Sequence, residues 1–324
     1  MLLVILGHTI LGTSYSKLNK FIFSFNMPIF FLLSGYLYKE RKVVVCIKNN
    51  FKKLIIPYFI TSSAVIVGRG VMAYIYTANK FEVHYIMKNT MIGALFGYGV
   101  DNAKGFEGIW SIGAIWFLLA IFWSNIIFCI IMNIKSKQYI FYIIAILSFF
   151  AYILGQIIWL PTNIDIGIFA IIYMYIGNMA KKNNKLNKKN SILSNIIMIL
   201  IWIVEIISDG VNMVIRYYPL YIISILGSVF GSYFIIKFCD NVIKNNNIKK
   251  FLSYIGKNSL TILCFHLFEM MIIPWDIITS LINIKNVLVI WQLKVILGVL
   301  FCLLINKLRI NNNENKYLSK FHIC

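Results

Sequence analysis

Long runs of apolar residues, separated by short polar stretches, follow one another along the whole chain. A helix needs about 20 apolar residues to cross the hydrocarbon core of a membrane. A spanning helix also satisfies its backbone hydrogen bonds internally, which lipid cannot do for it. The pattern therefore predicts an all-α fold, a polytopic membrane helix bundle of about ten transmembrane helices. The predicted spans are residues 1–12, 21–38, 54–76, 109–133, 139–160, 164–180, 192–209, 217–238, 259–281 and 287–306.

The first of these runs is too short to cross a membrane. Twelve residues at 1.5 Å each reach only about 18 Å, whereas the hydrocarbon core is roughly 30 Å thick. The run has neither a basic leader region nor a small-residue cleavage site, so it does not resemble a signal peptide. We therefore expect that the first helix is truncated and that residues before Met1 are missing from the sequence as written.

Lysine and arginine are distributed unevenly between the two sets of loops that alternate along the chain. One set holds 22 of these residues and the other holds 7. Because basic loops stay on the cytoplasmic side, both termini are expected in the cytoplasm. Residues 77–108 then form an outer loop, whose stretch 85–98 is expected to form a helix along the membrane surface. The basic set is 39–53, 134–138, 181–191, 237–258 and 307–324; the other is 13–20, 77–108, 161–163, 210–216 and 282–286.

Composition agrees with a single integral membrane domain over residues 1–324. Apolar residues make up 60% of the chain and charged residues 13%, about half the charged fraction of a soluble domain. A net charge of +20 in a soluble protein suggests nucleic acid as a partner. Here it reflects topology, so membrane lipids are expected and nucleic acid is not. The six cysteines show no metal-binding spacing, and no metal site is predicted.

Two histidines follow strongly apolar runs on different spans. His8 ends the run LLVILGH, and His266 lies within SLTILCFHLF. Polar groups at membrane depth are expensive and are therefore candidates for function. Burial favours the neutral imidazole, which can act as a general base. Either ring could instead serve packing, but two histidines on separate spans suggest that they meet inside the bundle.

Two further ionisable residues stand within predicted spans. Arg69 lies between two glycines and could hold an anionic ligand group such as a phosphate or a carboxylate; alternatively, its side chain snorkels to the outer interface. Glu205 precedes Asp209 by one turn. It is expected to pair with Arg216 or Arg69, and the alternative is a hydrogen bond to substrate hydroxyls.

The second span, FIFSFNMPIFFLLSGYLY, contains two features that interrupt a helix. Pro28 removes a backbone donor, and Ser34–Gly35 forms a weak point near the inner end. A broken helix at membrane depth is tolerated only against protein or a cavity. The pattern indicates either a site or tight core packing.

Six segments, in order along the chain, carry a resemblance to a known family. They are LVILGHT, FSFNMPIFFLLSGYLY, KKLIIPYF, AIWFLLAIF, LPTNIDIGIFAIIYMYIGNMAKK and IGKNSLTILCFH. With these segments the chain resembles acyltransferase family 3, the membrane O-acyltransferases, and is most similar to the fucose 4-O-acetylase-like sugar acetylases. The resemblance implies a bundle of about ten helices in the bacterial inner membrane. It also implies transfer of an acetyl group from cytoplasmic acetyl-CoA to a hydroxyl of a cell-surface or exported carbohydrate.

The resemblance also implies roles for individual residues. The family's first-helix histidine matches His8, and His266 is a second catalytic candidate. The family's basic residue eleven positions before that histidine falls outside the sequence. Lys52 and Lys53 stand where the family has an Arg-rich cluster. Lysine keeps the charge for the CoA phosphates but loses bidentate binding.

Two residues are substrate-binding candidates beside the histidines. Related sugar acetylases often have histidine where this chain has Asn26, so a role for a histidine there is absent. Asn26 or Trp116 is expected to orient the acyl group or the acceptor. Direct transfer and an acetyl-histidine relay both remain open.

Two other classes of function remain as alternatives. The broken second span and Arg69 also suit a transporter or flippase for a lipid-linked sugar, although no internal repeat of the kind found in many transporters is visible. A non-catalytic relative that scaffolds a glycan-assembly complex is the third. Dependence on acetyl-CoA distinguishes the acetyltransferase from the flippase.

Overall fold

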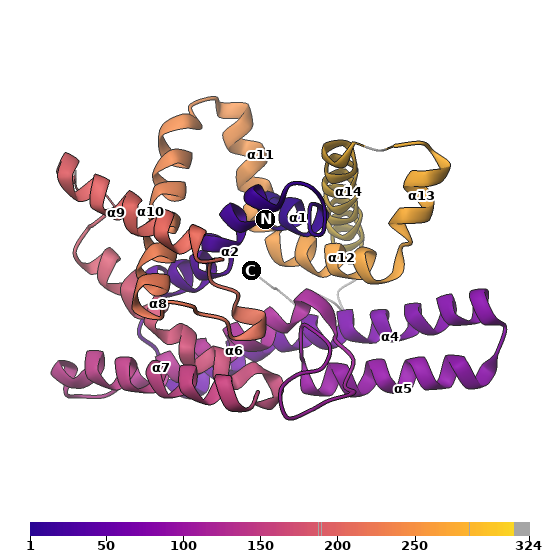
Figure 1. The fold of residues 1–324 in the computed structure, drawn as a ribbon, viewed down its shortest axis with the longest axis horizontal. Helices are drawn as coiled ribbons and strands as arrows, with labels where there is room; N and C mark the ends of the chain where they lie inside the picture. Colours follow the sequence, from indigo (N-terminus) through magenta and orange to yellow (C-terminus); the bar gives the residue numbers. More distant parts are fainter. Residues whose placement is uncertain (187, 189, 285, 314–324) are drawn as a thin grey trace.

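The computed structural model describes residues 1–313 except 187, 189 and 285, and this part of the chain is built from helices without a strand (Figure 1). The predicted all-α fold is confirmed. The helices are α1 (Leu2–Thr9), α2 (Ser16–Tyr36), α3 (Val43–Asn50), α4 (Ile56–Thr77), α5 (Lys80–Phe96), α6 (Trp116–Met132), α7 (Ile140–Ile157), α8 (Ile164–Lys182), α9 (Ile192–Ile207), α10 (Ile222–Val242), α11 (Asn246–Lys257), α12 (Ser259–Ile272), α13 (Trp275–Leu281) and α14 (Val287–Asn313).

Seven described segments are long and apolar enough to cross a membrane, so the chain is a multi-pass membrane protein. They are Ser16–Tyr36, Val43–Thr77, Gly113–Met132, Lys137–Ile157, Pro161–Lys182, Ile222–Asn241 and Val287–Leu308. The pair α12 and α13, bent by 75°, supplies an eighth if it is counted as one span. The other two predicted spans are helices as well. α1 has 8 residues and α9 has 16, which leaves both shorter than a full crossing.

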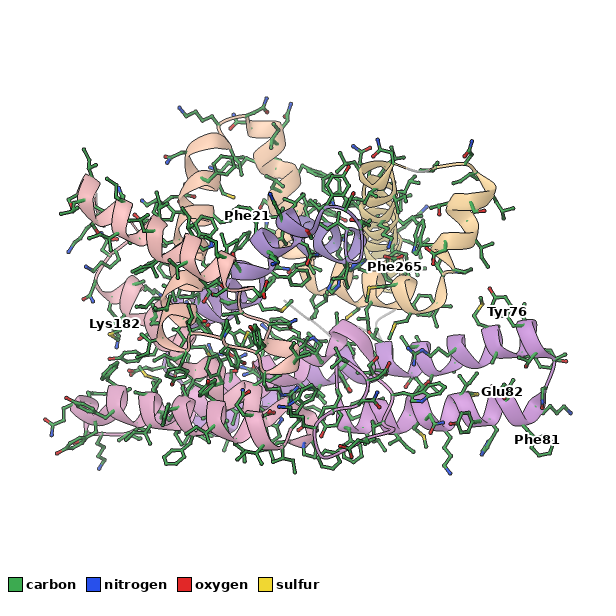
Figure 2. All side chains as sticks on the ribbon, viewed as in Figure 1. Phe21, Tyr76, Phe81, Glu82, Lys182 and Phe265 are labelled. Carbon is green, nitrogen blue, oxygen red and sulfur yellow. The ribbon has the colours of Figure 1, made fainter. Side chains whose placement is uncertain are left out.

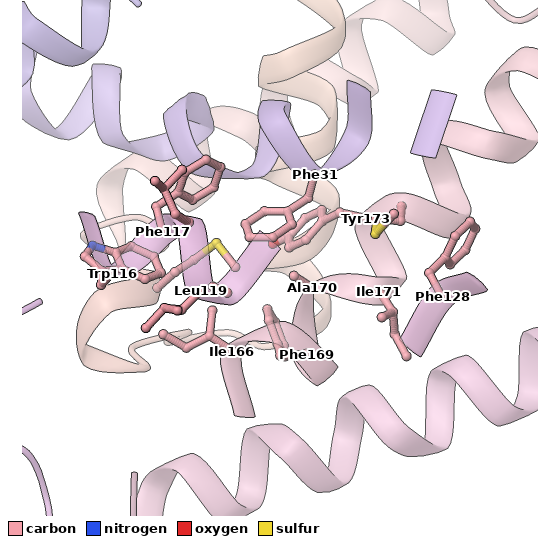
Figure 3. Packing of buried hydrophobic residues seen from close by; sticks show 14 of the residues in the cluster. Phe31, Trp116, Phe117, Leu119, Phe128, Ile166, Phe169, Ala170, Ile171 and Tyr173 are labelled. Atoms are coloured by element: carbon pink, nitrogen blue, oxygen red, sulfur yellow. The ribbon is translucent and has the colours of Figure 1, made fainter. Parts of the chain in front are cut away.

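Helices α6 and α8 lie at the centre of the bundle. In each of these two spans 67% of the most apolar window is buried inside the protein, against 17% for α14. Figure 3 shows Phe117 of α6 and Phe169 of α8 among the packed side chains, with Phe31 of α2 beside them. The helices at the centre therefore pack against protein, whereas α14 presents most of its surface outward.

Helices α2 and α8 touch backbone to backbone at two glycines. A Cβ atom added to Gly35 would lie 1.9 Å from the carbonyl oxygen of Met174, and one added to Gly177 would lie 2.0 Å from that of Leu32. Neither position has room for a side chain. The weak point expected at Ser34–Gly35 is therefore a packing contact.

The long segment Val43–Thr77 contains a π-helical stretch, Phe51–Ile55, between α3 and α4. Pro57 follows it and lacks the N–H that would bond one turn back. A proline is a known cause of such a local change in hydrogen bonding. This stretch carries Lys52 and Lys53, whose side chains are exposed.

Helix α5 contains most of the stretch 85–98, which was expected to form a helix along the membrane surface. The helix instead packs against α4. It begins at Lys80 and runs antiparallel beside α4 (Figure 1). Tyr76, Phe81 and Glu82 mark the tip of this hairpin, which projects from the rest of the molecule (Figure 2). Because α4 is part of a spanning segment, α5 follows the axis of that span and not the membrane surface.

Candidate functional site

The two predicted histidines meet. His8 of α1 and His266 of α12 have their ring centroids 5.7 Å apart, with the ring planes tilted by 46°. Phe23 on α2 also packs against the His8 ring in an edge-to-face arrangement, at a centroid distance of 5.8 Å. Residues 258 positions apart in the sequence thus form one site, and the prediction that they meet inside the bundle is confirmed.

A carboxylate fixes the orientation of His266. Its Nδ1 lies 2.6 Å from Oε1 of Glu269, three residues later on α12. The indole N–H of Trp275 donates to the other oxygen of Glu269. His266 is 2% exposed and Glu269 is fully buried. With Nδ1–H donating to the carboxylate, Nε2 of His266 carries the lone pair.

The bend between α12 and α13 makes this arrangement possible. Pro274 stands at the bend and cannot continue the helical hydrogen bonds. The chain turns by 75° there, so that Trp275, the first residue of α13, comes back over Glu269. A straight helix would direct residues 269 and 275 to different faces, because six positions correspond to about 600° of helical rotation.

Both imidazoles have a buried nitrogen without a protein partner. Within the part of the chain that the structure describes, Nε2 of His8 and Nε2 of His266 make no hydrogen bond. Buried polar atoms are nearly always paired with protein, water or a ligand. The two nitrogens are therefore groups whose hydrogen-bonding capacity the described protein atoms leave unused.

Helix α14 completes the site. Lys294 is 8% exposed, and its Nζ lies 5.0 Å from the centre of the Trp275 ring. Trp291, one turn earlier, donates from its indole nitrogen to the carbonyl oxygen of Leu2 at 3.1 Å and so holds α1 in place. Sequence reasoning missed Glu269, Trp275 and Lys294. The spacing of three between His266 and Glu269 is a signal that could have found the carboxylate.

Asn26 lies on the side of α2 that faces α1. It is 3% exposed, and its Nδ2 has no partner among the described residues. Residues three apart share a helix face, so Asn26 is on the face of Phe23, which contacts His8. Asn19, on the same face, donates from Nδ2 to the carbonyl oxygen of Gly7 at 2.9 Å. The predicted substrate-binding residue is thus on the same face of α2 as the ring that contacts the predicted catalytic residue.

Arg69 of α4 lines a separate cleft of about 450 Å³. Its guanidinium makes long contacts with Oγ1 of Thr90 (3.3 Å), the carbonyl oxygen of Ser111 (3.4 Å) and the sulfur of Met271 (3.5 Å). Met271 is on α12, five residues after His266. Arg69 therefore contacts the helix that carries the second histidine.

The predicted pairing of Glu205 with Arg216 or Arg69 is wrong. Oε1 of Glu205 accepts a hydrogen bond from the backbone N–H of Val211 at 2.9 Å, which closes the turn after α9, and Oε2 has no described partner. Arg216 instead binds both oxygens of Asp165 on α8, at 2.7 and 3.0 Å. Asn163, two residues before Asp165, also accepts from the guanidinium at 3.0 Å, so Arg216 is held at the start of α8.

The remaining predicted residues belong to other elements than the histidines. Trp116 is 4% exposed and packs in the apolar core beside Phe117 (Figure 3). Lys52 and Lys53 are exposed on the π-helical stretch. Their assigned roles stay predictions.

Comparison with known families adds one finding. The sequence model of an acyltransferase domain matches residues 1–307, nearly the whole chain. The match includes both histidines, Glu269 and every other residue of the site described above. No curated protein and no solved structure matches the chain.

Proposed function

The chain belongs to acyltransferase family 3, and on that premise we propose that it moves an acetyl group from cytoplasmic acetyl-CoA to a carbohydrate hydroxyl. Membership makes it a membrane acyltransferase. The acetyl donor, the carbohydrate acceptor and the placement in a bacterial inner membrane with both termini cytoplasmic are parts of the proposal. The assignment to the fucose 4-O-acetylase-like branch is also part of the proposal.

One observation supports the chemistry above all others: the half-buried imidazole of His8 and the buried imidazole of His266 are adjacent, and in the described part of the chain the Nε2 atom of each is buried without a partner. O-acyl transfer needs a base that takes the proton from the attacking hydroxyl. It also needs an acid that gives a proton to the departing sulfur. A pair of adjacent imidazoles can do both in succession.

In the proposed reaction, His8 takes the proton of the acceptor hydroxyl as its oxygen attacks the thioester carbonyl. The new C–O bond forms, the C–S bond breaks, and the sulfur leaves with the electron pair. His266 accepts the proton from His8 at Nε2 and delivers it to the sulfur, giving the free thiol of CoA. Glu269, bonded to Nδ1 at 2.6 Å, balances the charge while His266 holds two protons. Both histidines finish as they began.

Other residues have supporting roles in this proposal. Asn26 offers an unpaired amide N–H on the same side as His8 and is proposed to hold the acceptor or the acyl oxygen. Lys52 and Lys53 are exposed and basic, as the CoA phosphates require. Trp116 is proposed to shape the wall behind the acyl group from within the core.

The test uses inverted membrane vesicles that contain the protein, supplied with radiolabelled acetyl-CoA. Replacement of His8 by Ala, or of His266 by Ala, is expected to lower incorporation of label into glycan by about 10²–10⁴-fold, the usual contribution of general acid–base catalysis. His84→Ala is the matched control, because His84 is exposed on α5; its rate is expected to be that of the unaltered protein.

Undiminished labelling after both replacements would remove the proposed mechanism. Movement of unmodified lipid-linked sugar across the membrane, without consumption of acetyl-CoA, would instead identify the protein as a flippase. Neither outcome depends on knowing the acceptor in advance.

A further inference from the structure

The cleft beside Arg69 is built by the loop between α5 and α6. It measures about 450 Å³, is open to the surface, and is lined by Arg69, Asp101, Asn102, Gly108, Ile109 and Trp110. Five of these six residues come from the loop, which the proposed topology places on the outer side of the membrane. The cleft is separate from the pair of histidines, and the proposed chemistry does not use it.

Arg69 keeps much of its binding capacity unused. Its three contacts within the protein are 3.3 Å or longer, near the outer limit for a hydrogen bond. In the described part of the chain it forms no ion pair with a carboxylate. A guanidinium has five N–H donors, so several remain for a ligand in the cleft.

Acceptors stand opposite these donors. One oxygen of Asp101 accepts from the backbone N–H of Ser111, and its second oxygen has no partner among the described residues. Asn102 lines the same cleft. Among the described residues its side chain accepts one long hydrogen bond, of 3.5 Å, from the N–H of Gly108. With one cation and one carboxylate, the lining has no net charge. Asp101 repels an anion, so the phosphate or carboxylate expected for Arg69 from the sequence fits this cleft poorly.

Trp110 adds a flat apolar surface next to these polar groups. The edge of its ring meets Tyr85 of α5 at a centroid distance of 5.8 Å, which sets the orientation of the indole. Pockets for small molecules combine an apolar wall with a few polar groups that fix orientation. A neutral sugar ring, with hydroxyls at its edge and C–H groups on its faces, matches both parts of this lining.

The loop is anchored at several points, so the cleft exists before any ligand binds. The hydroxyl of Tyr98 donates to the carbonyl oxygen of Trp159 at 3.0 Å, and both residues are buried. A Cβ atom at Gly93 would lie 2.0 Å from the carbonyl oxygen of Trp110, so α5 packs directly on the loop backbone. Such preorganisation reduces the entropy lost on binding.

The cleft is also close to the histidines along α12. Met271, which Arg69 contacts, follows His266 by five residues, or about 7.5 Å of helix rise. The cleft and the histidine pair therefore adjoin the same helix, about one and a half turns apart.

From these observations we infer that the cleft is a binding subsite for a neutral hexose or N-acetylhexosamine unit of the acceptor. The inference rests on the proposed function and names the acceptor class. Arg69 and Asn102 donate to sugar hydroxyls, Asp101 accepts from them, and Trp110 covers one face of the ring. The unit held here is a neighbour of the one that is acetylated.

Direct binding tests this independently of catalysis. The full chain, purified in detergent with His266 replaced by Ala so that no turnover occurs, is applied to an array of oligosaccharides. The array carries neutral hexose and N-acetylhexosamine chains next to uronate- and phosphate-containing ones. Binding to neutral chains is expected, and Trp110→Ala is expected to weaken it by about tenfold or more. Asp101→Asn is expected to weaken neutral binding and to raise binding of uronate chains.

Matched controls come from the same part of the molecule. Glu107→Gln removes a carboxylate of the same loop that does not line the cleft, and Phe81→Ala removes an aromatic ring that is 87% exposed at the hairpin tip. Both variants are expected to bind as the parent does. Retention of binding by Trp110→Ala, preference for anionic chains, or absence of binding to any neutral chain would overturn the inference.

The outcome is separable from that of the proposed function. Neutral-glycan binding that depends on Trp110, without acetyl transfer in vesicles, would leave the subsite standing and the transfer reaction wrong. Acetyl transfer that depends on His8, together with glycan binding that Trp110→Ala does not change, would support the transfer reaction and show that the subsite is wrong.

Discussion

Glu269 accepts hydrogen bonds from two rings at once, from Nδ1 of His266 and from the indole of Trp275. A glutamine at this position has one acceptor oxygen and one NH₂ donor, so it can satisfy only one of these two N–H groups. The other donor is left unpaired, or His266 changes tautomer and loses the lone pair on Nε2. Glu269→Gln is therefore expected to lower kcat, by up to about 10⁴-fold, the loss seen when the carboxylate that fixes the tautomer of an acid–base histidine becomes an amide.

Glu269 acts through His266, so the replacement should leave the KM for acetyl-CoA nearly unchanged. Glu82→Gln on the exposed tip of the hairpin is the matched control for loss of one carboxylate. A fall in protein yield equal to the fall in rate, with kcat per folded molecule preserved, would show that Glu269 serves stability alone.

Among single residues, the sequence predicted the two histidines but not the side chains that support them. His8 and His266 are conspicuous because each follows an apolar run, and burial makes a polar group noticeable. Glu269 lies three residues after His266, a spacing visible in the sequence. Trp275 reaches it only through the bend at Pro274, whose angle no local pattern specifies. Glu205 was given the wrong partner because the identity of a neighbour across helices is a long-range property.

Helices α9 and α10 pack through a pair of glycines four residues apart. A Cβ atom at Gly227 would lie 2.4 Å from Cβ of Glu205, and one at Gly231 would lie 2.5 Å from the indole nitrogen of Trp202. Small residues at this spacing let membrane helices approach closely. Gly227→Val is expected to destabilise the protein by about 1–3 kcal/mol, the usual penalty for overpacking.

Thermal unfolding in detergent measures this effect. Gly256→Ala is the control, since a Cβ atom there meets nothing within 4 Å and alanine favours the helix over glycine. An equal transition temperature for Gly227→Val and the parent would show that α9 moves away from α10 without loss of stability.

At the scale of elements, every predicted apolar run is a helix in the structure, because composition alone limits what can exist in lipid. The prediction that α5 lies along the membrane surface was wrong. The stretch 85–98 was expected along the membrane surface, but close packing on α4 and on the backbone of Trp110 places this helix alongside α4. The sequence contains no pattern that distinguishes these two placements for a helix of mixed polarity.

The whole molecule brings the two ends of the chain together at the site. The indole of Trp291 binds the backbone of Leu2, and these residues are separated by almost the entire bundle in sequence. Hydropathy predicts how many helices exist and which loops share a side, but not which helices are neighbours. The bundle was predictable for that reason. The two histidines indicated that α1 and α12 are neighbours, but no sequence pattern indicated that α14 lies beside α1.

The loop charges lead to a topology prediction for the entire bundle. In a variant whose native cysteines are replaced, a cysteine at Lys104 is expected to react with an impermeant maleimide added to intact cells. A cysteine at Lys182 is expected to react only after the membrane is opened. Both positions are exposed on the protein, so their reactivity reports the side of the membrane. Labelling of Lys182→Cys in intact cells would reverse the assigned orientation.

The direct contact between the backbones of α2 and α8 limits how this protein can change over generations. Any lineage that descends from it has to keep glycine at 35 and 177, because even a single methyl group there meets a carbonyl of the opposite helix. A larger residue is tolerated at 35 or 177 only if the two helices move apart. Substitutions are therefore expected to accumulate first on the outward faces of the bundle.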